Sequence, residues 1–384
     1  MNQEAALEIQ TPGWMSELNP SQRLAVLHSG GPLLVLAGAG SGKTRVITYR
    51  IAYLIEACGA SPWNILAVTF TNKAAHEMKE RVVSLLGERA EAVLVSTFHS
   101  LCARMLRRDA VSLGISPEFT IYDETDSLSV VQQAKAQVAG ECALKPQRIR
   151  AKISAAKSEM MTPEDLAQSL DKDYVEGQQL ARIFAAYEEI LRANQAMDFD
   201  DLLLVTIRLL TEVSDVRDRY QRRFRHVLVD EYQDTNSAQY KILKLLTGGS
   251  SKPDLCVVGD DDQSIYRWRG ARLNNILDFE KDFPGTRVVR LEENYRSTQT
   301  ILNASNAMVA HNQKRKGKTL WTRNVQGAAL QLLSGDDEQQ EAAQVVETIL
   351  RERQSRGTGT GIAVFYRTNS QSRALEETLI QWRV

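Results

Sequence analysis

Cysteine is scarce in this chain, with four residues among 384. Cys58, Cys102, Cys142 and Cys256 lie far apart, without a Cys-x-x-Cys pair or a histidine at ligand spacing. We therefore expect reduced cysteines in the protein core and no zinc site.

Long apolar runs are also missing. No stretch approaches the roughly 18 to 20 apolar residues that cross a bilayer, and the N-terminus lacks the basic and apolar blocks of a secretory signal. These features predict a cytoplasmic protein that makes no membrane contact.

Neither sign of charge dominates, because 47 Lys and Arg residues oppose 48 Asp and Glu residues. This balance argues against a uniformly basic coat for nucleic acid, although basic residues gather at 145–157, 217–225 and 314–323. Each cluster alone is more simply a solvated helix face, and a local basic groove remains the alternative.

The chain does contain short apolar runs that suit the buried strands of a parallel sheet. They lie at 33–37, 65–69, 92–96, 226–229, 255–259 and 287–291. The stretch 106–195 carries helical signals instead. Thr162-Pro163-Glu164-Asp165 predicts a helix start, and apolar residues at three-and-four spacing predict one helix face. That face comprises Leu180, Ile183, Phe184, Tyr187, Ile190 and Leu191.

After residue 291 the pattern begins again, with apolar runs at 330–333 and 362–365 around a helical segment near 338–353. We predict an α/β fold with a sheet domain in two segments, a helical insertion and the start of a second sheet domain. The expected ranges are 1–105 and 196–290 for the sheet domain, 106–195 for the insertion and 291–384 for the second sheet domain.

The first run is followed by a loop of small residues, a lysine and a threonine. The segment reads Ala37, Gly38, Ala39, Gly40, Ser41, Gly42, Lys43 and Thr44. Such a loop between a strand and a helix can turn its backbone N–H groups around phosphate oxygens, while the lysine meets the β and γ phosphates and the threonine holds Mg²⁺. Ala37 replaces the usual first glycine, but the later glycines keep the backbone freedom.

The run at 226–229 ends in Asp230 and Glu231. Adjacent acids are costly at the end of an apolar run, and here Asp230 is suited to hold the metal while Glu231 orients and deprotonates an attacking water. Together the two segments predict the binding and hydrolysis of ATP with Mg²⁺.

Three further segments favour a polynucleotide as the second ligand. Short polar groups and aromatic rings follow two strands, and a third segment places a glutamine close to more rings. The residues are Phe70, Thr71 and Asn72; Thr97, Phe98 and His99; and Gln263, Tyr266, Trp268 and Arg269. Gln263 is expected to sense the γ-phosphate, and Tyr266 and Trp268 to stack on bases. The alternatives are helix caps with a core phenylalanine for the first two segments and a core tryptophan for the third, and His99 alone is more simply structural.

In this order the segments resemble the UvrD/Rep/PcrA family of superfamily-one DNA helicases, from Leu18 to Val384. The resemblance implies two RecA-like domains, with Gln22 reading adenine, Tyr295 reaching the nucleotide and Arg296 acting as an arginine finger. It adds Arg45 to the nucleotide site, and it matches Asp198-Phe199-Asp200-Asp201 to a motif of undefined chemistry.

The resemblance further implies 3′-to-5′ movement on single-stranded DNA and at single/double-strand junctions, in repair or replication. The chain stops before the family's last motifs, so we expect an N-terminal fragment that hydrolyses ATP slowly and does not unwind duplexes. Two alternatives stay open: an ATP-gated DNA-binding module without motor activity, and a phosphotransferase acting on a metabolite.

Overall fold

The computed structural model describes residues 13–138, 143–170, 175–249, 254–266, 270–357 and 361–384. It forms two compact units, one up to Val325 and one from Gln326 to Val384, and each is described by itself.

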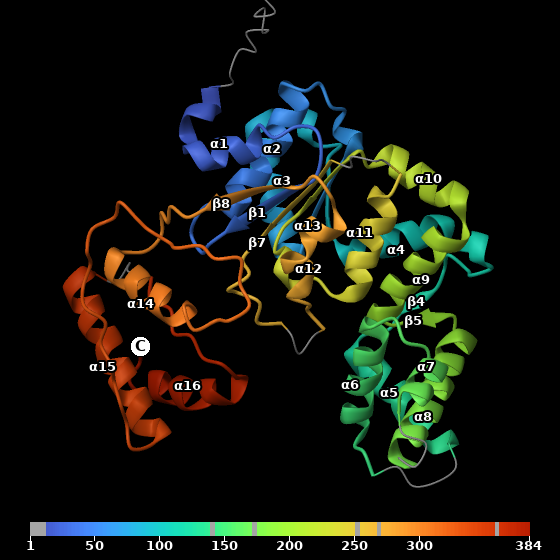
Figure 1. The fold of residues 1–384 in the computed structure, drawn as a ribbon. Coiled ribbons are helices and arrows are strands. Elements are labelled where there is room, and N and C mark those ends of the chain that lie inside the picture. Colours follow the sequence, from blue (N-terminus) through green and yellow to red (C-terminus); the bar gives the residue numbers. More distant parts are fainter. Residues whose placement is uncertain (1–12, 139–142, 171–174, 250–253, 267–269, 358–360) are drawn as a thin grey trace, which may run out of the picture. The chain divides into compact units, whose positions relative to one another are not determined.

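The first unit is built on a six-stranded parallel sheet with the order β3-β2-β6-β7-β1-β8 (Figure 1). Its strands are β1 (Leu33–Ala37), β2 (Ile65–Thr69), β3 (Leu94–Thr97), β6 (His226–Val229), β7 (Asp254–Gly259) and β8 (Arg287–Leu291). All six predicted strands are confirmed, and β3 begins two residues later than expected.

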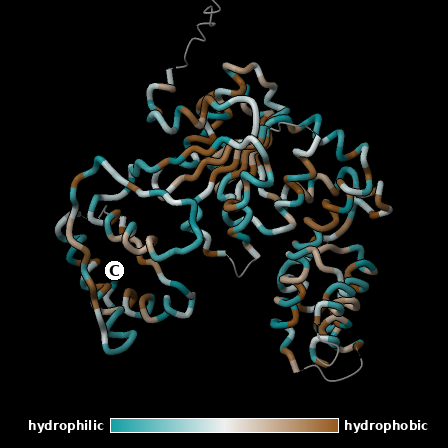
Figure 2. The backbone as a smooth tube through the Cα atoms, viewed as in Figure 1, coloured by the Kyte–Doolittle hydropathy of each residue, from teal (hydrophilic) through white to brown (hydrophobic). Residues whose placement is uncertain are grey.

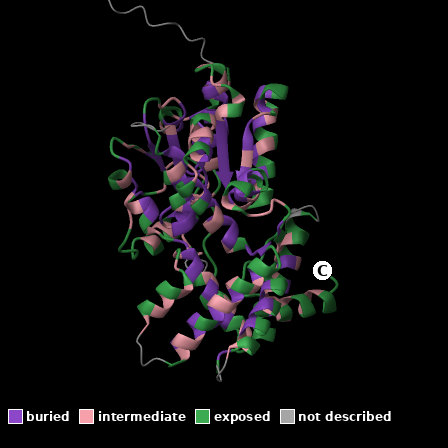
Figure 3. Ribbon diagram, turned by 90° about the vertical axis from the view of Figure 1, so that its right-hand side faces the viewer, coloured by how far each residue is buried: buried purple, intermediate pink, exposed green. Residues whose placement is uncertain are grey.

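Helices cover both faces of this sheet, which is why its strands read as continuous apolar runs. Leu34 and Leu36 pack on one face with α4, α9, α10 and α11, whereas Leu33 and Val35 pack on the other with α1, α2 and α3. The strands form the apolar and buried centre of the unit (Figures 2 and 3). The covering helices are α1 (Pro20–Val26), α2 (Lys43–Glu56), α3 (Asn72–Leu86), α4 (Phe98–Asp109), α9 (Phe199–Glu212), α10 (Ser214–Arg223) and α11 (Ser237–Thr247).

The predicted insertion is helical and encloses a core of its own. It contains α5 (Glu124–Gln137), α6 (Pro146–Ser158), α7 (Pro163–Ser169) and α8 (Val175–Ala193), and the short parallel strands β4 (Thr120–Ile121) and β5 (Ala196–Met197) pair at its base. Thr162 caps α7 in a capping box with Asp165, as the sequence predicts. The expected face of α8 is buried, with Ile190 only partly so.

Shorter elements complete the first unit. They are α12 (Asn274–Leu277), α13 (Phe279–Asp282), α14 (Gln299–Val309) and the 3₁₀ turns η1 (Gly13–Glu17), η2 (Pro62–Asn64), η3 (Gly87–Ala90), η4 (Ala110–Leu113) and η5 (Tyr232–Asp234). Cys102 and Cys256 are buried as expected, but Cys58 is exposed, and Cys142 lies outside the described residues.

The second unit contains α15 (Glu338–Arg356), η7 (Asn369–Gln371) and α16 (Ser372–Gln381). The helix predicted near 338–353 is confirmed, but the runs 330–333 and 362–365 are not strands. Leu332 and Phe365 are 94% and 93% exposed, and among the described residues no strand pairs with either run to satisfy its backbone. Within the residues that the structure describes, no helix has the length and apolar character needed to cross a membrane.

Candidate nucleotide and nucleic-acid site

The loop between β1 and α2 has the backbone that its glycines predict. Gly40 and Gly42 have φ of 66° and 89°, in the left-handed region that favours glycine. Gly42 is the N-cap of α2, so the start of this helix opens into the loop. Ser41 is buried, and its hydroxyl donates to the carbonyl of Gly38 at 2.7 Å. This arrangement suits an anion.

The structure brings Lys43 and Glu231 together. The ammonium of Lys43 lies 3.0 Å from Oε2 of Glu231, across 188 positions of sequence. Glu231 has φ of 48°, which is unusual for a residue with a side chain and stores strain at this turn.

Asp230 is 8% exposed at the end of β6 and accepts a hydrogen bond from the backbone of Glu231 at 2.9 Å. Burial and then the neighbouring charge of Glu231 raise the pKa of Asp230 to about 6. A buried acid beside a second acid is suited to a divalent cation, and Thr44 offers a hydroxyl next to Lys43.

Gln233 is a site residue without a predicted role in the sequence analysis. Its Nε2 donates to Oε2 of Glu231 at 2.8 Å and to Asp234 at 3.2 Å, and its Oε1 accepts from the backbone of Asp260 at 2.9 Å. Its position in the acidic run after β6 was the available signal. Gln263 lies in the turn held by Gln233, and its backbone N–H donates to the carbonyl of Asp260 at 3.0 Å.

The segment after β8 lies directly on the loop. Asn294 donates to the carbonyl of Ala39 at 2.6 Å, and the backbone of Tyr295 donates to Gly40 at 3.0 Å. Asn294 also accepts from the backbone of Arg296 at 2.9 Å, so it fixes the turn that carries this arginine. Tyr295 and Arg296 are exposed beside the loop, whereas the sequence missed the buried Asn294.

Gln22 also lies against the loop, but its amide is engaged by the protein. Nε2 donates to the carbonyl of Ser41 at 2.9 Å, and Oε1 accepts from the backbone of Asn19 at 3.1 Å. Asn19 in turn donates to the hydroxyl of Tyr295 at 2.7 Å. Arg45 is exposed on the first turn of α2.

Aromatic side chains gather at the carboxyl ends of the strands. The rings of Phe70 and Tyr266 lie 4.9 Å apart with an interplanar angle of 30°. His99 lies 5.9 Å from Phe199, edge to face, and Phe199 is 51% exposed. Burial lowers the pKa of His99, which favours a neutral ring. The sequence named Phe199 only as part of an acidic motif, so its exposed ring was missed.

For Thr71 and Thr97 the structure fits the helix-cap alternative better than a contact with DNA. Thr71 and Thr97 accept hydrogen bonds from the backbones of Ala74 and Ser100, at the starts of α3 and α4. Phe98 is 5% exposed and packs in the sheet core, so its ring is not accessible to a base.

Asn72 links the two segments by accepting from the hydroxyl of Thr97 at 3.3 Å. Trp268 and Arg269 lie outside the described residues.

Comparison with known proteins places these features in a family. The profile of the UvrD/REP helicase N-terminal domain matches residues 18–284, and that of the UvrD-like helicase C-terminal domain matches residues 289–384. Relatives from Staphylococcus aureus and Staphylococcus epidermidis, each named ATP-dependent DNA helicase PcrA, are 48% identical over 368 residues, which is 96% of this chain and 50% of the relative.

The chain therefore spans about half the length of the curated relatives it matches. The first profile covers the glycine-rich loop before Lys43, the acids Asp230 and Glu231, and the rings of Phe70 and Tyr266. The chain therefore belongs to the UvrD/REP helicase family.

Proposed function

We propose that this chain carries the ATP-hydrolysing centre of a DNA helicase that moves along single-stranded DNA. The observation that supports it best is the 3.0 Å contact of Lys43 with Glu231. This contact lies at the carboxyl ends of the sheet strands, where the Phe70–Tyr266 pair also lies. A hydrolytic site and a surface for bases thus share one sheet, and the curated relatives are named as ATP-dependent DNA helicases.

In this proposal the loop N–H groups bind the phosphates of ATP, and Lys43 exchanges Glu231 for phosphate oxygens. Glu231, released from the lysine, takes a proton from the water that attacks the γ-phosphate, while Arg296 stabilises the charge that develops. Thr44 and Asp230 would hold Mg²⁺, which supplies positive charge to the phosphate oxygens. Gln263 orients the water or the γ-phosphate.

The aromatic pair forms the base-binding surface, extended by Phe199 and His99. Stacking tolerates every base and contributes about 1–3 kcal/mol per base. Asn72 and the backbone near Thr71 and Thr97 would contact the DNA backbone, with Trp268 and Arg269 assigned from the sequence. The 3′-to-5′ direction, binding to strand junctions, action in repair or replication, a cytoplasmic location and the four domain ranges are proposed from the family resemblance.

One assay tests this function: ATP turnover by the chain with and without an unstructured oligonucleotide. We expect DNA to accelerate turnover, and Lys43→Ala to abolish it while leaving the protein folded. Nucleotide-gated DNA binding without turnover would support the switch alternative instead. Turnover that ignores the oligonucleotide would favour a metabolite phosphotransferase.

A further inference from the structure

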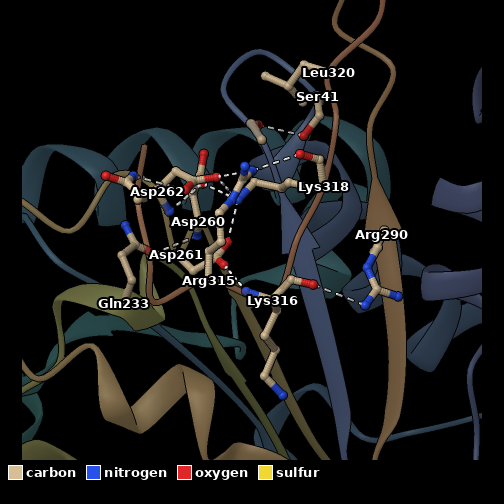
Figure 4. Close-up of polar contacts among 12 residues, drawn as sticks. Ser41, Gln233, Asp260, Asp261, Asp262, Arg290, Arg315, Lys316, Lys318 and Leu320 are labelled. Carbon is tan, nitrogen blue, oxygen red and sulfur yellow. Dashed lines mark hydrogen bonds and ion pairs between the residues drawn. The ribbon is translucent and has the colours of Figure 1, made fainter. Parts of the chain in front are cut away.

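Three consecutive acids at the end of β7 surround one lysine (Figure 4). The ammonium of Lys318 lies 2.7 Å from Asp260 and 2.9 Å from Asp262, and it also pairs with Asp261. The lysine side chain is 3% exposed, although it belongs to the basic cluster 314–323 that suggested a solvated face. The three carboxylates lie within 4.8 Å of one another, as in a metal site, but here the cation is an ammonium.

Arg315 and the backbone of the same segment extend these contacts. Arg315 donates to Asp262 and to the carbonyl of Lys318, both at 2.8 Å, and the backbone N–H of Lys316 donates to Asp261 at 2.7 Å. We call the contacts of Asp260, Asp261 and Asp262 with Arg315 and Lys318 the clasp. Burying this many charges is favourable only when each is closely paired, and Arg315 and Lys318 supply that pairing here.

On one side the clasp continues into the hydrolytic centre. The backbone of Asp260 donates to Gln233, Gln233 donates to Glu231, and Glu231 pairs with Lys43, at 2.9, 2.8 and 3.0 Å. These contacts form a continuous series from the clasp to Lys43, at the end of the glycine-rich loop between β1 and α2.

On the other side the clasp continues into the loop itself. Two residues after Lys318, the side chain of Leu320 covers the α-carbon of Gly38 so closely that a methyl group there would collide with it. The clasp therefore holds a segment that covers the loop as well as a turn that adjoins Glu231.

We infer that Lys318 is a positioning residue for ATP hydrolysis. It fixes the turn of Asp260 and Gln263, and through Gln233 it fixes the carboxylate of Glu231. Among the described residues, Lys318 contacts none of the groups assigned to phosphate, so it acts through these neighbours. The consequence for catalysis rests on the proposed function, whereas the position of the clasp does not.

The test compares Lys318→Met with Lys316→Met, a matched control in the same segment. The Lys316 ammonium pairs with Glu280 rather than with the clasp, and in Figure 4 its side chain points away from the three acids. We expect Lys318→Met to lower kcat for ATP by about 10–100-fold, as for residues that orient metal-site ligands. KM should change less than about threefold, because the loop itself is intact. Lys316→Met should behave as the wild type.

Lys318→Arg should recover much of kcat because it restores a cation among the acids. Equal kcat in the Lys318→Met and Lys316→Met proteins would overturn the inference. If Lys318→Met does not fold, Asp261→Asn is the second variant. It keeps the lysine and removes one carboxylate, and it should reduce kcat several-fold with KM unchanged; an unchanged kcat would overturn the inference.

A second measurement is independent of turnover. Without Lys318, Arg315 still pairs with Asp262, but Asp260 and Asp261 lose their cation, and oxygen ligands suit Mn²⁺. We therefore expect Lys318→Met to bind one more Mn²⁺ than the wild type and Lys316→Met, by spectroscopic titration without nucleotide. If the wild type does not hydrolyse ATP, the proposed function fails. The titration alone then tests whether Lys318 neutralises the acids of the clasp. Equal Mn²⁺ binding by all three proteins would then overturn it.

Discussion

Gly40 is subject to two separate constraints at the scale of one residue. Its φ of 66° disfavours any side chain, and a β-carbon there would lie 2.7 Å from Cβ of Arg296 and from Nδ2 of Asn294. The segment that carries the arginine can therefore approach the loop only because residue 40 has no side chain.

We predict that Gly40→Ala lowers the free energy of unfolding by about 1–3 kcal/mol and sharply reduces ATP turnover. The matched control is Gly30→Ala, since Gly30 has φ of 87° but nothing within 4 Å of the added carbon. The control should lose about 1 kcal/mol and keep its turnover. Denaturant unfolding and steady-state turnover check both. Identical behaviour of the two variants would show that contact with Arg296 is unimportant.

The residues that the sequence assigns to the proposed site are those whose signal is local. The loop from Ala37 to Thr44 and the Asp230–Glu231 pair are each recognisable from a few neighbouring positions. Gln233 and Asn294 were not predicted, because their contacts with Asp260 and Ala39 span 27 and 255 positions. Phe98 was predicted wrongly because a residue after a capping threonine can point into the core as readily as outward.

At the scale of secondary-structure elements, the acidic motif after β5 acquires a physical role. Asp198 is the N-cap of α9 in a capping box with Asp201, and both carboxylates bind Lys157 of α6, at 2.8 and 2.7 Å. Glu188 of α8 also pairs with this lysine at 2.6 Å. Lys157 is 1% exposed, so a buried ionic network joins the helical insertion to α9.

We predict that Lys157→Met lowers the free energy of unfolding by about 3–5 kcal/mol, because it leaves several buried carboxylates without a cation. Lys152→Met is the control, since Lys152 is exposed on the same helix and should change stability by less than about 0.5 kcal/mol. Equilibrium unfolding in denaturant measures both changes. A difference below about 1 kcal/mol between the variants would contradict a stabilising role for the network.

Asp200 in the same motif provides a test by pH. Burial and then the charge of Asp198 raise the pKa of Asp200 to about 6. When the pKa of an acid is raised in the folded state, the protonated acid's contribution to the free energy of unfolding is fully present below about pH 4. This contribution is lost as the pH rises through about 6.

We therefore predict that Asp200→Asn is more stable than the wild type at about pH 8, by at most about 3 kcal/mol, and loses this advantage near pH 4. Thermal unfolding of both proteins at the two pH values measures the difference. A stability gain that is the same at both pH values would contradict burial as the cause.

The strands show which elements a sequence can predict. The runs of the first unit became strands because each lies beside another strand and beneath helices, so their apolar composition and their environment agree. The runs 330–333 and 362–365 have the same composition but lack a neighbouring strand in the described residues. A strand needs the hydrogen bonds of its neighbour, which its own composition cannot supply.

At the scale of the whole first unit, the helical insertion contacts the segment that follows the aromatic pair. Glu159, directly after α6, accepts from Arg272 at 2.8 Å and from the hydroxyl of Ser237 at 3.1 Å. Arg272 follows Tyr266 by six positions, and Ser237 begins α11 shortly after the acidic pair. One carboxylate thus joins the insertion to both candidate ligand surfaces.

We predict that Glu159→Ala changes the free energy of unfolding by less than about 1 kcal/mol, because this ion pair is largely exposed. The same change should reduce the acceleration of ATP turnover by DNA, since it releases the insertion from the segment beyond Tyr266. The charge-reversed pair Glu159→Arg with Arg272→Glu should recover part of the acceleration, whereas Arg272→Glu alone should not. Turnover titrated with oligonucleotide measures this coupling, and full acceleration in Glu159→Ala would show that the insertion does not communicate with the site through this contact.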